Sequence, residues 1–212
     1  MRAVHAFASM MLAGAVAAST GSAQTLEAPS ASDPSLAALS RALDRRLTVW
    51  QAGDRPVYVR HCRSARGGCR ERTAAFARLI ADVSDDHAVD PFLVAAMAIR
   101  ESGLDPTAAG AAGERGIVQL HPRGIGSSVR FVQSEAYRRR CTRRPDACQR
   151  EVLDVGARLL SRGIERCGGV LEGLGAYNRG ACGATRYGTR VMRERQRLLR
   201  LAKTDARLAD LD

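Results

Sequence analysis

The sequence contains few aromatic residues and few histidines, and this scarcity narrows the functions open to it. Phenylalanine, tyrosine and tryptophan make up 4% of the 212 residues, and there are four histidines. No recognisable nucleic-acid-binding module accompanies the basic residues. No cluster of residues has the spacing of a metal or phosphate site. We therefore expect no nucleic-acid partner and no metal or other cofactor.

Beyond its first residues, the chain also lacks an apolar run that could cross a membrane. Arg2 precedes the short apolar run AFASMMLAGAVAA, and small residues follow, including Gly21 and Ala23. This order is typical of a secretory signal peptide, and no cysteine follows that could carry a lipid. We predict a signal peptide at 1–23 and a soluble exported protein, periplasmic or secreted. A buried N-terminal helix is the alternative.

The six cysteines fit an exported protein, because disulfides persist in oxidising compartments. Six cysteines allow 15 pairings in principle. Each cysteine has a near neighbour in the sequence, and we predict that these neighbours pair as Cys62/Cys69, Cys141/Cys148 and Cys167/Cys182. The alternative is a zinc site, but these spacings are wider than the gaps of common zinc motifs.

Acidic residues are outnumbered by basic ones, 22 to 33, and the formal net charge is +11. Arginine supplies most of this charge. The stretch YRRRCTRRPDACQR holds Arg138, Arg139, Arg140, Arg143, Arg144 and Arg150. Such a balance favours contact with polyanions, among them the carboxylates of the bacterial cell wall, anionic membranes and nucleic acids. For the cluster itself we favour a solvated basic face over any one of these partners.

Strand patterns are almost absent, whereas helical periodicity recurs along the chain. Asp33 and Pro34 form a helix start, followed by an apolar stripe of Leu36, Leu39, Leu43, Leu47 and Trp50. Further helices are expected over 70–83 and 91–102, from 151, over 171–177 and over 189–202. The segment 107–128 is rich in glycine and is expected to form loops around one short helical turn. The fold class is therefore mostly α.

Glu101 lies on the apolar stripe of the predicted helix at 91–102. It follows Val94, Met97 and Ala98 at helical spacing, so it shares their buried face. Apolar surroundings and the negative end of the helix dipole both raise the pKa of a carboxyl group. A carboxylic acid that stays protonated near neutral pH suits general acid catalysis of glycosidic cleavage. A salt-bridged or outward-facing glutamate is the alternative.

Three ordered blocks accompany this glutamate: ESG, then GAAGERGIVQLHP, and later GLGAYNRGACG. Together they resemble the SLT-type lytic transglycosylase family over about residues 74–184. The matching positions are Glu101–Gly103, Pro106, Gly113, Gly116, Gln119, Pro122, Ala176–Asn178 and Gly180. The resemblance implies a lysozyme-like helical domain of the goose type, here stapled by disulfides.

The resemblance also implies a reaction, the cleavage of the β-1,4 bond between N-acetylmuramic acid and N-acetylglucosamine in peptidoglycan. Glu101 would act first as general acid and then as general base, and the muramoyl C6 hydroxyl would close a 1,6-anhydro ring. Peptidoglycan glycan strands are the expected partner, and a cell-envelope machine is a second candidate. The substrate-binding residues implied are Ser102, Gly113, Gly116, Gln119, Tyr177 and Asn178.

The chain departs from the family pattern inside the second block. Gly110 stands where the family usually has serine, and Ile117–Val118 replaces leucine and methionine. Glu114 and Arg115 add charge within the motif. His121 opens a continuation that lacks the family's apolar character, and we expect this histidine in an exposed loop.

The residue patterns and the resemblance together divide the chain into five segments. We expect the signal peptide at 1–23, a linker at 24–33, an N-terminal helix with a disulfide-closed connection at 34–72, the catalytic domain at 73–184 and a basic helix at 185–212. Two other functions remain open on this scaffold. One is a hydrolytic muramidase, with Asp90 or Asp105 as the nearest second carboxylates. The other is a weakly active cell-wall binding protein. A basic protein that binds membrane or nucleic acid rests on charge alone.

Overall fold

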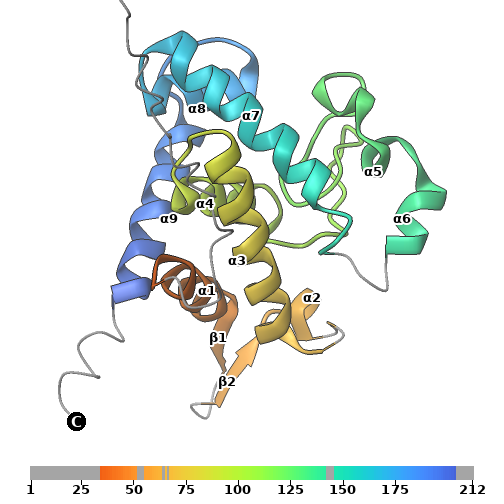
Figure 1. Cartoon of the computed structure of the whole chain (residues 1–212), viewed down its shortest axis with the longest axis vertical. Coiled ribbons are helices and arrows are strands. Elements are labelled where there is room, and N and C mark those ends of the chain that lie inside the picture. Colours follow the sequence, from red (N-terminus) through yellow and green to blue (C-terminus); the bar gives the residue numbers. More distant parts are fainter. Residues whose placement is uncertain (1–33, 52–54, 64, 66, 142–145, 204–212) are drawn as a thin grey trace, which may run out of the picture. The chain divides into compact units, whose positions relative to one another are not determined.

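Helices make up most of the computed structural model of the chain, which describes residues 34–51, 55–63, 65, 67–141 and 146–203. The predicted signal peptide, linker and Asp33 lie outside these residues. Figure 1 shows the elements, which are α1 (Pro34–Leu47), β1 (Thr48–Gln51), β2 (Arg55–Tyr58), α2 (Arg60–Arg63), α3 (Cys69–Asp86), α4 (Pro91–Ser102), the 3-10 turn η1 (Ile125–Ser128), α5 (Arg130–Gln133), α6 (Glu135–Cys141), α7 (Arg150–Cys167), α8 (Val170–Arg179) and α9 (Arg186–Lys203). The prediction of a mostly α fold is confirmed. None of the described helices is long and apolar enough to cross a bilayer.

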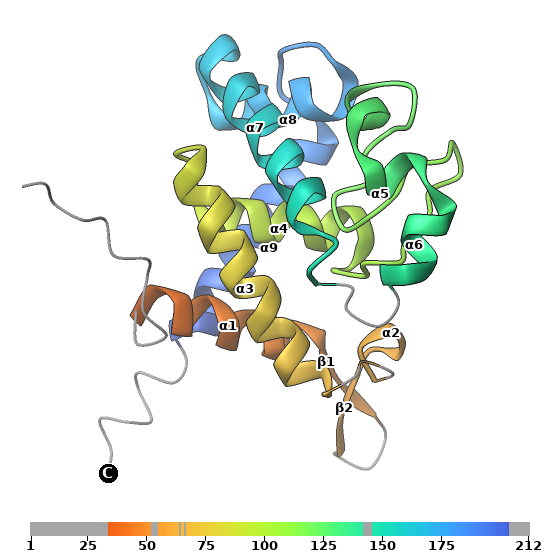
Figure 2. The same ribbon diagram turned by 45° about the vertical axis from the view of Figure 1, so that its right-hand side comes forward.

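The first helix is shorter than its apolar stripe predicts, because a hairpin follows it. We expected the helix to continue through Trp50, and this is wrong: α1 ends at Leu47, and Trp50 lies in β1. β1 pairs antiparallel with β2, and Trp50 lies opposite Pro56. Thr48, Val49 and Trp50 are residue types that favour strands, so a nearby pairing partner outweighs the helical period. Figure 2 shows the hairpin extending beyond the helices near the start of α3.

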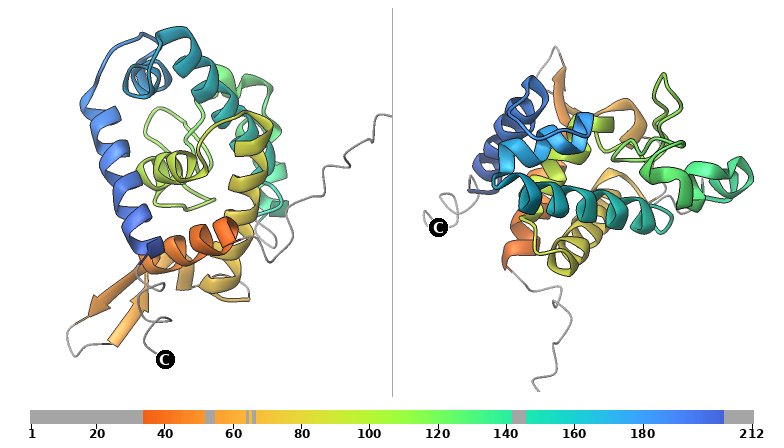
Figure 3. Two further views of the ribbon diagram at one scale, coloured as in Figure 1. Left: turned by 60° about the vertical axis from the view of Figure 1, so that its left-hand side comes forward. Right: turned by 90° about the horizontal axis from the view of Figure 1, so that it is seen from above.

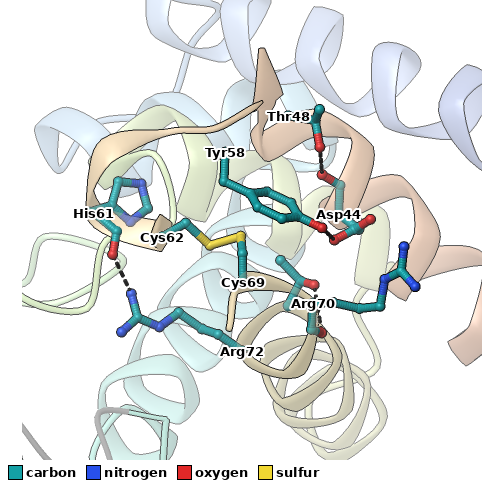
Figure 4. Close-up of a disulfide and its surroundings, with 9 residues drawn as sticks. Asp44, Thr48, Tyr58, His61, Cys62, Cys69, Arg70 and Arg72 are labelled. Atoms are coloured by element: carbon teal, nitrogen blue, oxygen red, sulfur yellow. Dashed lines mark hydrogen bonds between the residues drawn. A yellow bond between two sulfur atoms is a disulfide. The ribbon is translucent and has the colours of Figure 1, made fainter. Parts of the chain in front are cut away.

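Three disulfides join the cysteines that are neighbours in the sequence, as predicted. They are Cys62–Cys69, Cys141–Cys148 and Cys167–Cys182. The first ties α2 to the start of α3 (Figure 4). Beside it, the Tyr58 hydroxyl donates to Asp44 Oδ1 at 2.8 Å, and Arg72 Nη1 donates to the His61 carbonyl at 2.8 Å. These bonds fasten the hairpin to α1 and α2 to α3.

Helix α4 is the central element of the fold. The left view of Figure 3 shows it nearly end-on, with α1, α3, α9 and the α7–α8 pair around it. Its start is capped as predicted: Asp90 Oδ1 accepts the Phe92 N–H at 2.9 Å, and Pro91 occupies the first helical position. Every residue from Leu93 to Ile99 is buried. Glu101 therefore lies two residues beyond a fully buried segment whose position the neighbouring helices fix, after the exposed Arg100.

The C-terminal helices complete the enclosure of α4. Helix α8 packs against α7, and α9 packs against both α4 and α1. Two ion pairs support α9: Glu194 pairs with Arg46 of α1, and Arg195 pairs with Asp90 at the cap of α4. The short helices α5 and α6 were not predicted, because helices of four and seven residues show too little periodicity to be recognised.

Candidate active site

Glu101 lies in a cleft of about 660 Å³, a size typical of ligand-binding sites. It occupies the last turn of α4, and Gly103 ends this helix in the left-handed conformation with φ 68°. Of the predicted site residues, the cleft brings together Glu101, Gln119, Tyr177 and Asn178. They come from three separate segments, namely α4, the loop that follows it, and α8.

The surroundings of Glu101 favour its protonated form. Burial raises the pKa of the carboxyl group above its ordinary value, and the negative charge of Glu114 raises it further. A hydrogen bond from Tyr187 and the positive charge of Arg100 act in the opposite direction, but burial is the largest effect. The direction agrees with the one expected from the apolar stripe. Glu101 therefore keeps its proton to a higher pH than an exposed glutamate does.

Tyr187 is the residue most closely joined to Glu101, and sequence reasoning missed it. Its hydroxyl donates to Glu101 Oε1 at 2.5 Å. Burial and the charge of Glu101 raise the pKa of the tyrosine, so it stays a donor. The predicted helix began only at Thr189, whereas α9 begins at Arg186, because the Thr185 hydroxyl accepts the Gly188 N–H at 3.0 Å and caps the helix. The sequence does hold a signal for Tyr187. It is one of only four tyrosines, and it stands two residues after Thr185, a residue type that often caps the start of a helix.

Tyr177 and Asn178 reach the cleft from the last turn of α8. The Tyr177 hydroxyl donates to the Val118 carbonyl at 2.8 Å, so this group holds α8 to the loop that carries Gln119. Its ring lies nearly parallel to that of Tyr187, with ring centroids 6.5 Å apart and an angle of 9° between the planes. Asn178 is exposed, and its side chain lines the cleft.

Gln119 is held in an unusual backbone conformation. Its φ is 49°, in the left-handed region that residues other than glycine rarely adopt. The side chain stabilises this turn, because Nε2 donates to the Gly116 carbonyl at 2.8 Å and to the Ala108 carbonyl at 3.3 Å. Its donors therefore support the loop, and its oxygen lies beside Gly110 at the cleft. Strain of this kind is commonly held at functional sites.

Three of the predicted site residues lie outside the residues that line the cleft. Ser102 Oγ donates to the Ile117 carbonyl at 2.9 Å and to the Ala98 carbonyl at 3.2 Å, so it ties α4 to the following loop. Gly113 and Gly116 adopt φ values of 96° and 81° within that loop. Their positions indicate that they shape the loop that presents Gln119.

Two residues that the motif comparison treated as incidental line the cleft with Glu101. These are Glu114 and His121, the second of which we had expected in an exposed loop. The alternative second carboxylates have structural roles instead. Asp90 caps α4, and Asp105 Oδ1 accepts hydrogen bonds from the Thr107 N–H at 2.8 Å and the Thr107 hydroxyl at 2.7 Å.

A family model matches the chain and covers most of the described fold. The model is that of the transglycosylase SLT domain, and it matches residues 78–199, from α3 to near the end of α9. No curated protein and no solved structure matches significantly. Among the described residues, no group of three or more histidine, cysteine, aspartate or glutamate side chains is arranged to hold a metal ion.

Proposed function

The chain belongs to the transglycosylase SLT domain family, whose members act on peptidoglycan, and on that premise we propose that it is an exported lytic transglycosylase with Glu101 as its catalytic residue. The bond cleaved is the β-1,4 link between N-acetylmuramic acid and N-acetylglucosamine. One observation carries the proposal: a half-buried carboxyl group with a raised pKa lies in a cleft and is hydrogen-bonded by a tyrosine.

In the first step, protonated Glu101 donates its proton to the glycosidic oxygen. The bond between this oxygen and C1 of the muramoyl sugar breaks, and the N-acetylglucosamine unit leaves as a neutral alcohol. Burial raises the pKa of the carboxyl group and so favours the protonated form that this task needs, because a charged carboxylate is poorly solvated there. Positive charge develops at C1, and the negative charge of the carboxylate that remains on Glu101 can stabilise it.

In the second step, the carboxylate of Glu101 takes the proton of the muramoyl C6 hydroxyl while its oxygen bonds to C1. The 1,6-anhydro ring forms, and Glu101 returns to its protonated state. Tyr187 assists here, since its hydrogen bond to Oε1 stabilises the charged carboxylate between the two steps. The nucleophile belongs to the substrate, so this chemistry needs one catalytic acid where most glycosidases need two.

The remaining cleft residues suit the positioning of a saccharide. The ring of Tyr177 offers an apolar face, and its hydroxyl is already bound to Val118. The exposed amide of Asn178 can both donate and accept hydrogen bonds, and the oxygen of Gln119 can accept one. These residues hold the glycan, whereas Ser102, Gly113 and Gly116 support the loop.

Export and surface charge are consistent with a cell-wall substrate. The basic, apolar and small-residue order of the first 23 residues directs the chain out of the cytoplasm. The full sequence carries a net charge of +11, and Arg2 is the only charged residue of its first 23, so the mature protein stays strongly basic and is attracted to the carboxylates of the peptide stems. The protein accordingly acts in the periplasm or outside the cell, on the glycan strands or beside a machine that crosses the wall.

The variant Glu101→Gln tests the catalytic role directly. The amide keeps the shape of the side chain but can neither give nor take the proton, so clearing of a peptidoglycan suspension should fall by a factor of 10² or more. Sedimentation of the protein with insoluble peptidoglycan should stay close to that of the wild type. The matched control is Glu165→Gln, an exposed position on α7 outside the cleft, which should keep full activity. A Glu101→Gln variant that still clears the suspension would contradict the proposal.

A further inference from the structure

Gly110 and Glu114 compete for a single place in the wall of the cleft. A Cβ atom on residue 110 would lie 2.2 Å from Glu114 Oε2 and 3.0 Å from Glu114 Cδ. Real Cβ atoms do not approach other atoms so closely, so the observed position of the Glu114 side chain requires glycine at 110. The two departures from the family pattern, the glycine at 110 and the acid at 114, are therefore linked physically.

The loop holds the carboxylate of Glu114 in this place. The Ala112 N–H donates to Oε2 at 3.0 Å. The backbone beneath is closed by two further bonds, from the Gly110 N–H to the Glu114 carbonyl at 3.0 Å and from the Gly113 N–H to the Gly110 carbonyl at 3.1 Å. Glu114 is half-buried and lines the same cleft as Glu101. Its carboxylate is thus presented to the cleft by a fixed backbone.

We propose that Glu114 is a specificity-determining carboxylate of the cleft, which accepts hydrogen bonds from N–H or O–H groups of the bound glycan at the place left open by Gly110. The inference deepens the proposed function and rests on it. An ionised carboxylate offers acceptors only, whereas a serine at position 110 would offer both a donor and an acceptor. The cleft therefore favours a glycan that presents donor groups to this wall and disfavours one that presents a carboxylate there.

Glu114 also acts on the catalytic acid through its charge. Four kinds of influence meet at Glu101: burial and Glu114 raise its pKa, and the Tyr187 hydrogen bond and Arg100 lower it. His121 and Arg179 line the same cleft. Removing the charge of Glu114 lowers the pKa of Glu101, so the acid loses its proton at a lower pH. Because the protonated form begins the reaction, the alkaline limb of activity should move to lower pH.

Two variants of Glu114 separate its hydrogen bond to the glycan from the effect of its charge on the pKa of Glu101. Glu114→Ala removes both, so KM for solubilised glycan strands should rise about tenfold, as for the loss of one hydrogen bond to a charged group. Glu114→Gln keeps an acceptor oxygen, so its KM should rise less, while its alkaline limb should move as far as that of Glu114→Ala. Glu165→Gln removes one exposed negative charge outside the cleft and should change neither quantity.

A substitution at position 110 tests independently whether a side chain there and the Glu114 carboxylate would occupy the same space. Gly110→Ala should displace the Glu114 carboxylate and raise KM by a factor similar to that of Glu114→Ala. The double variant should then be little worse than either single one, because the same contact is lost in each. The Cβ would also lie 2.9 Å from Gln119 Oε1, so a small residual effect of Gly110→Ala is expected in the double variant.

Binding measured in the inactive Glu101→Gln background keeps this inference apart from the proposed function. Weaker binding of glycan strands to Glu101→Gln/Glu114→Ala than to Glu101→Gln would support Glu114, even if the wild type released no product and the catalytic proposal failed. Unchanged binding and an unmoved alkaline limb in the Glu114 variants would overturn the inference. Fully additive losses in Gly110→Ala/Glu114→Ala would overturn it too.

Discussion

In the proposed mechanism Glu101 serves as an acid and then as a base, and the residues around it act on these two states in opposite directions. Burial favours the neutral carboxylic acid, whereas the hydroxyl of Tyr187 favours the carboxylate. A group that must alternate between two states works best when neither is strongly preferred near the working pH. The tyrosine thus offsets part of the effect of burial.

Replacement of Tyr187 by phenylalanine tests this balance. The hydrogen bond lowers the pKa of Glu101, so its loss should raise that pKa and move the alkaline limb of kcat/KM to higher pH, opposite to the Glu114 variants. Turnover should fall about tenfold, because the carboxylate between the two steps loses a charge-assisted hydrogen bond. A pH profile of glycan cleavage measures both effects. Tyr137→Phe, on α6 outside the cleft, is the control, and a limb that moves to lower pH would contradict the account.

The sequence predicted those site residues whose signal is local, and it missed those that the fold brings in. Glu101, Gln119, Tyr177 and Asn178 stand in short ordered blocks and meet in the cleft. Tyr187 lies 86 positions from Glu101, so nothing close in the sequence indicates their hydrogen bond. The relation between Gly110 and Glu114 depends on a rotamer and a turn, which a motif comparison does not show.

At the scale of elements, the packing of α8 on α7 places Tyr177 and Asn178. The contact is close because Gly173 lies against the backbone of α7: a Cβ there would be 2.7 Å from both the Cα and the nitrogen of Ile164. Backbone atoms cannot turn aside as a side chain can. The two helices can hold this distance only while residue 173 lacks a side chain.

Gly173→Ala should therefore destabilise the protein, although alanine forms helices better than glycine by about 1 kcal/mol. We expect the free energy of unfolding to fall by about 1–3 kcal/mol, as for other overpacked sites. Activity should fall as well, since α8 moves away from the cleft. Denaturant unfolding and lysis assays measure the two effects. Gly188→Ala is the control and should destabilise the protein less, because its Cβ would lie 3.3 Å from the nearest atom. A Gly173→Ala protein as stable as the wild type would refute the packing argument.

The helices with long amphipathic patterns were predictable, and the short elements were not. Helices α3, α4, α7, α8 and α9 follow apolar residues at helical spacing. The end of α1 was predicted too late in the chain. Residues 48–51 form a strand because they pair with residues 55–58, and the helical spacing of apolar residues over 34–50 carries no information about that pairing. Tertiary pairing of this kind outweighs local preference.

At the scale of the molecule, the N-terminal and C-terminal helices are part of the structure that holds Glu101, the proposed catalytic residue. Helix α9 packs on α4, contributes Tyr187 and is joined to α1 through Glu194 and Arg46. The family match extends to residue 199 and so includes most of α9. The cleft thus depends on elements from both ends of the described chain. Under the proposed function, the net charge of +11 of the full sequence favours its approach to an acidic cell wall.

The central claim is that the C6 hydroxyl of the substrate, and not water, completes the reaction that Glu101 begins. Mass spectrometry of the soluble products tests it most directly, with purified peptidoglycan and the mature protein with its disulfides intact. The account predicts muropeptides that end in 1,6-anhydro-N-acetylmuramic acid, absent when Glu101→Gln replaces the wild type. Products with reducing ends, heavier by one water, would contradict it and would show that water is the acceptor.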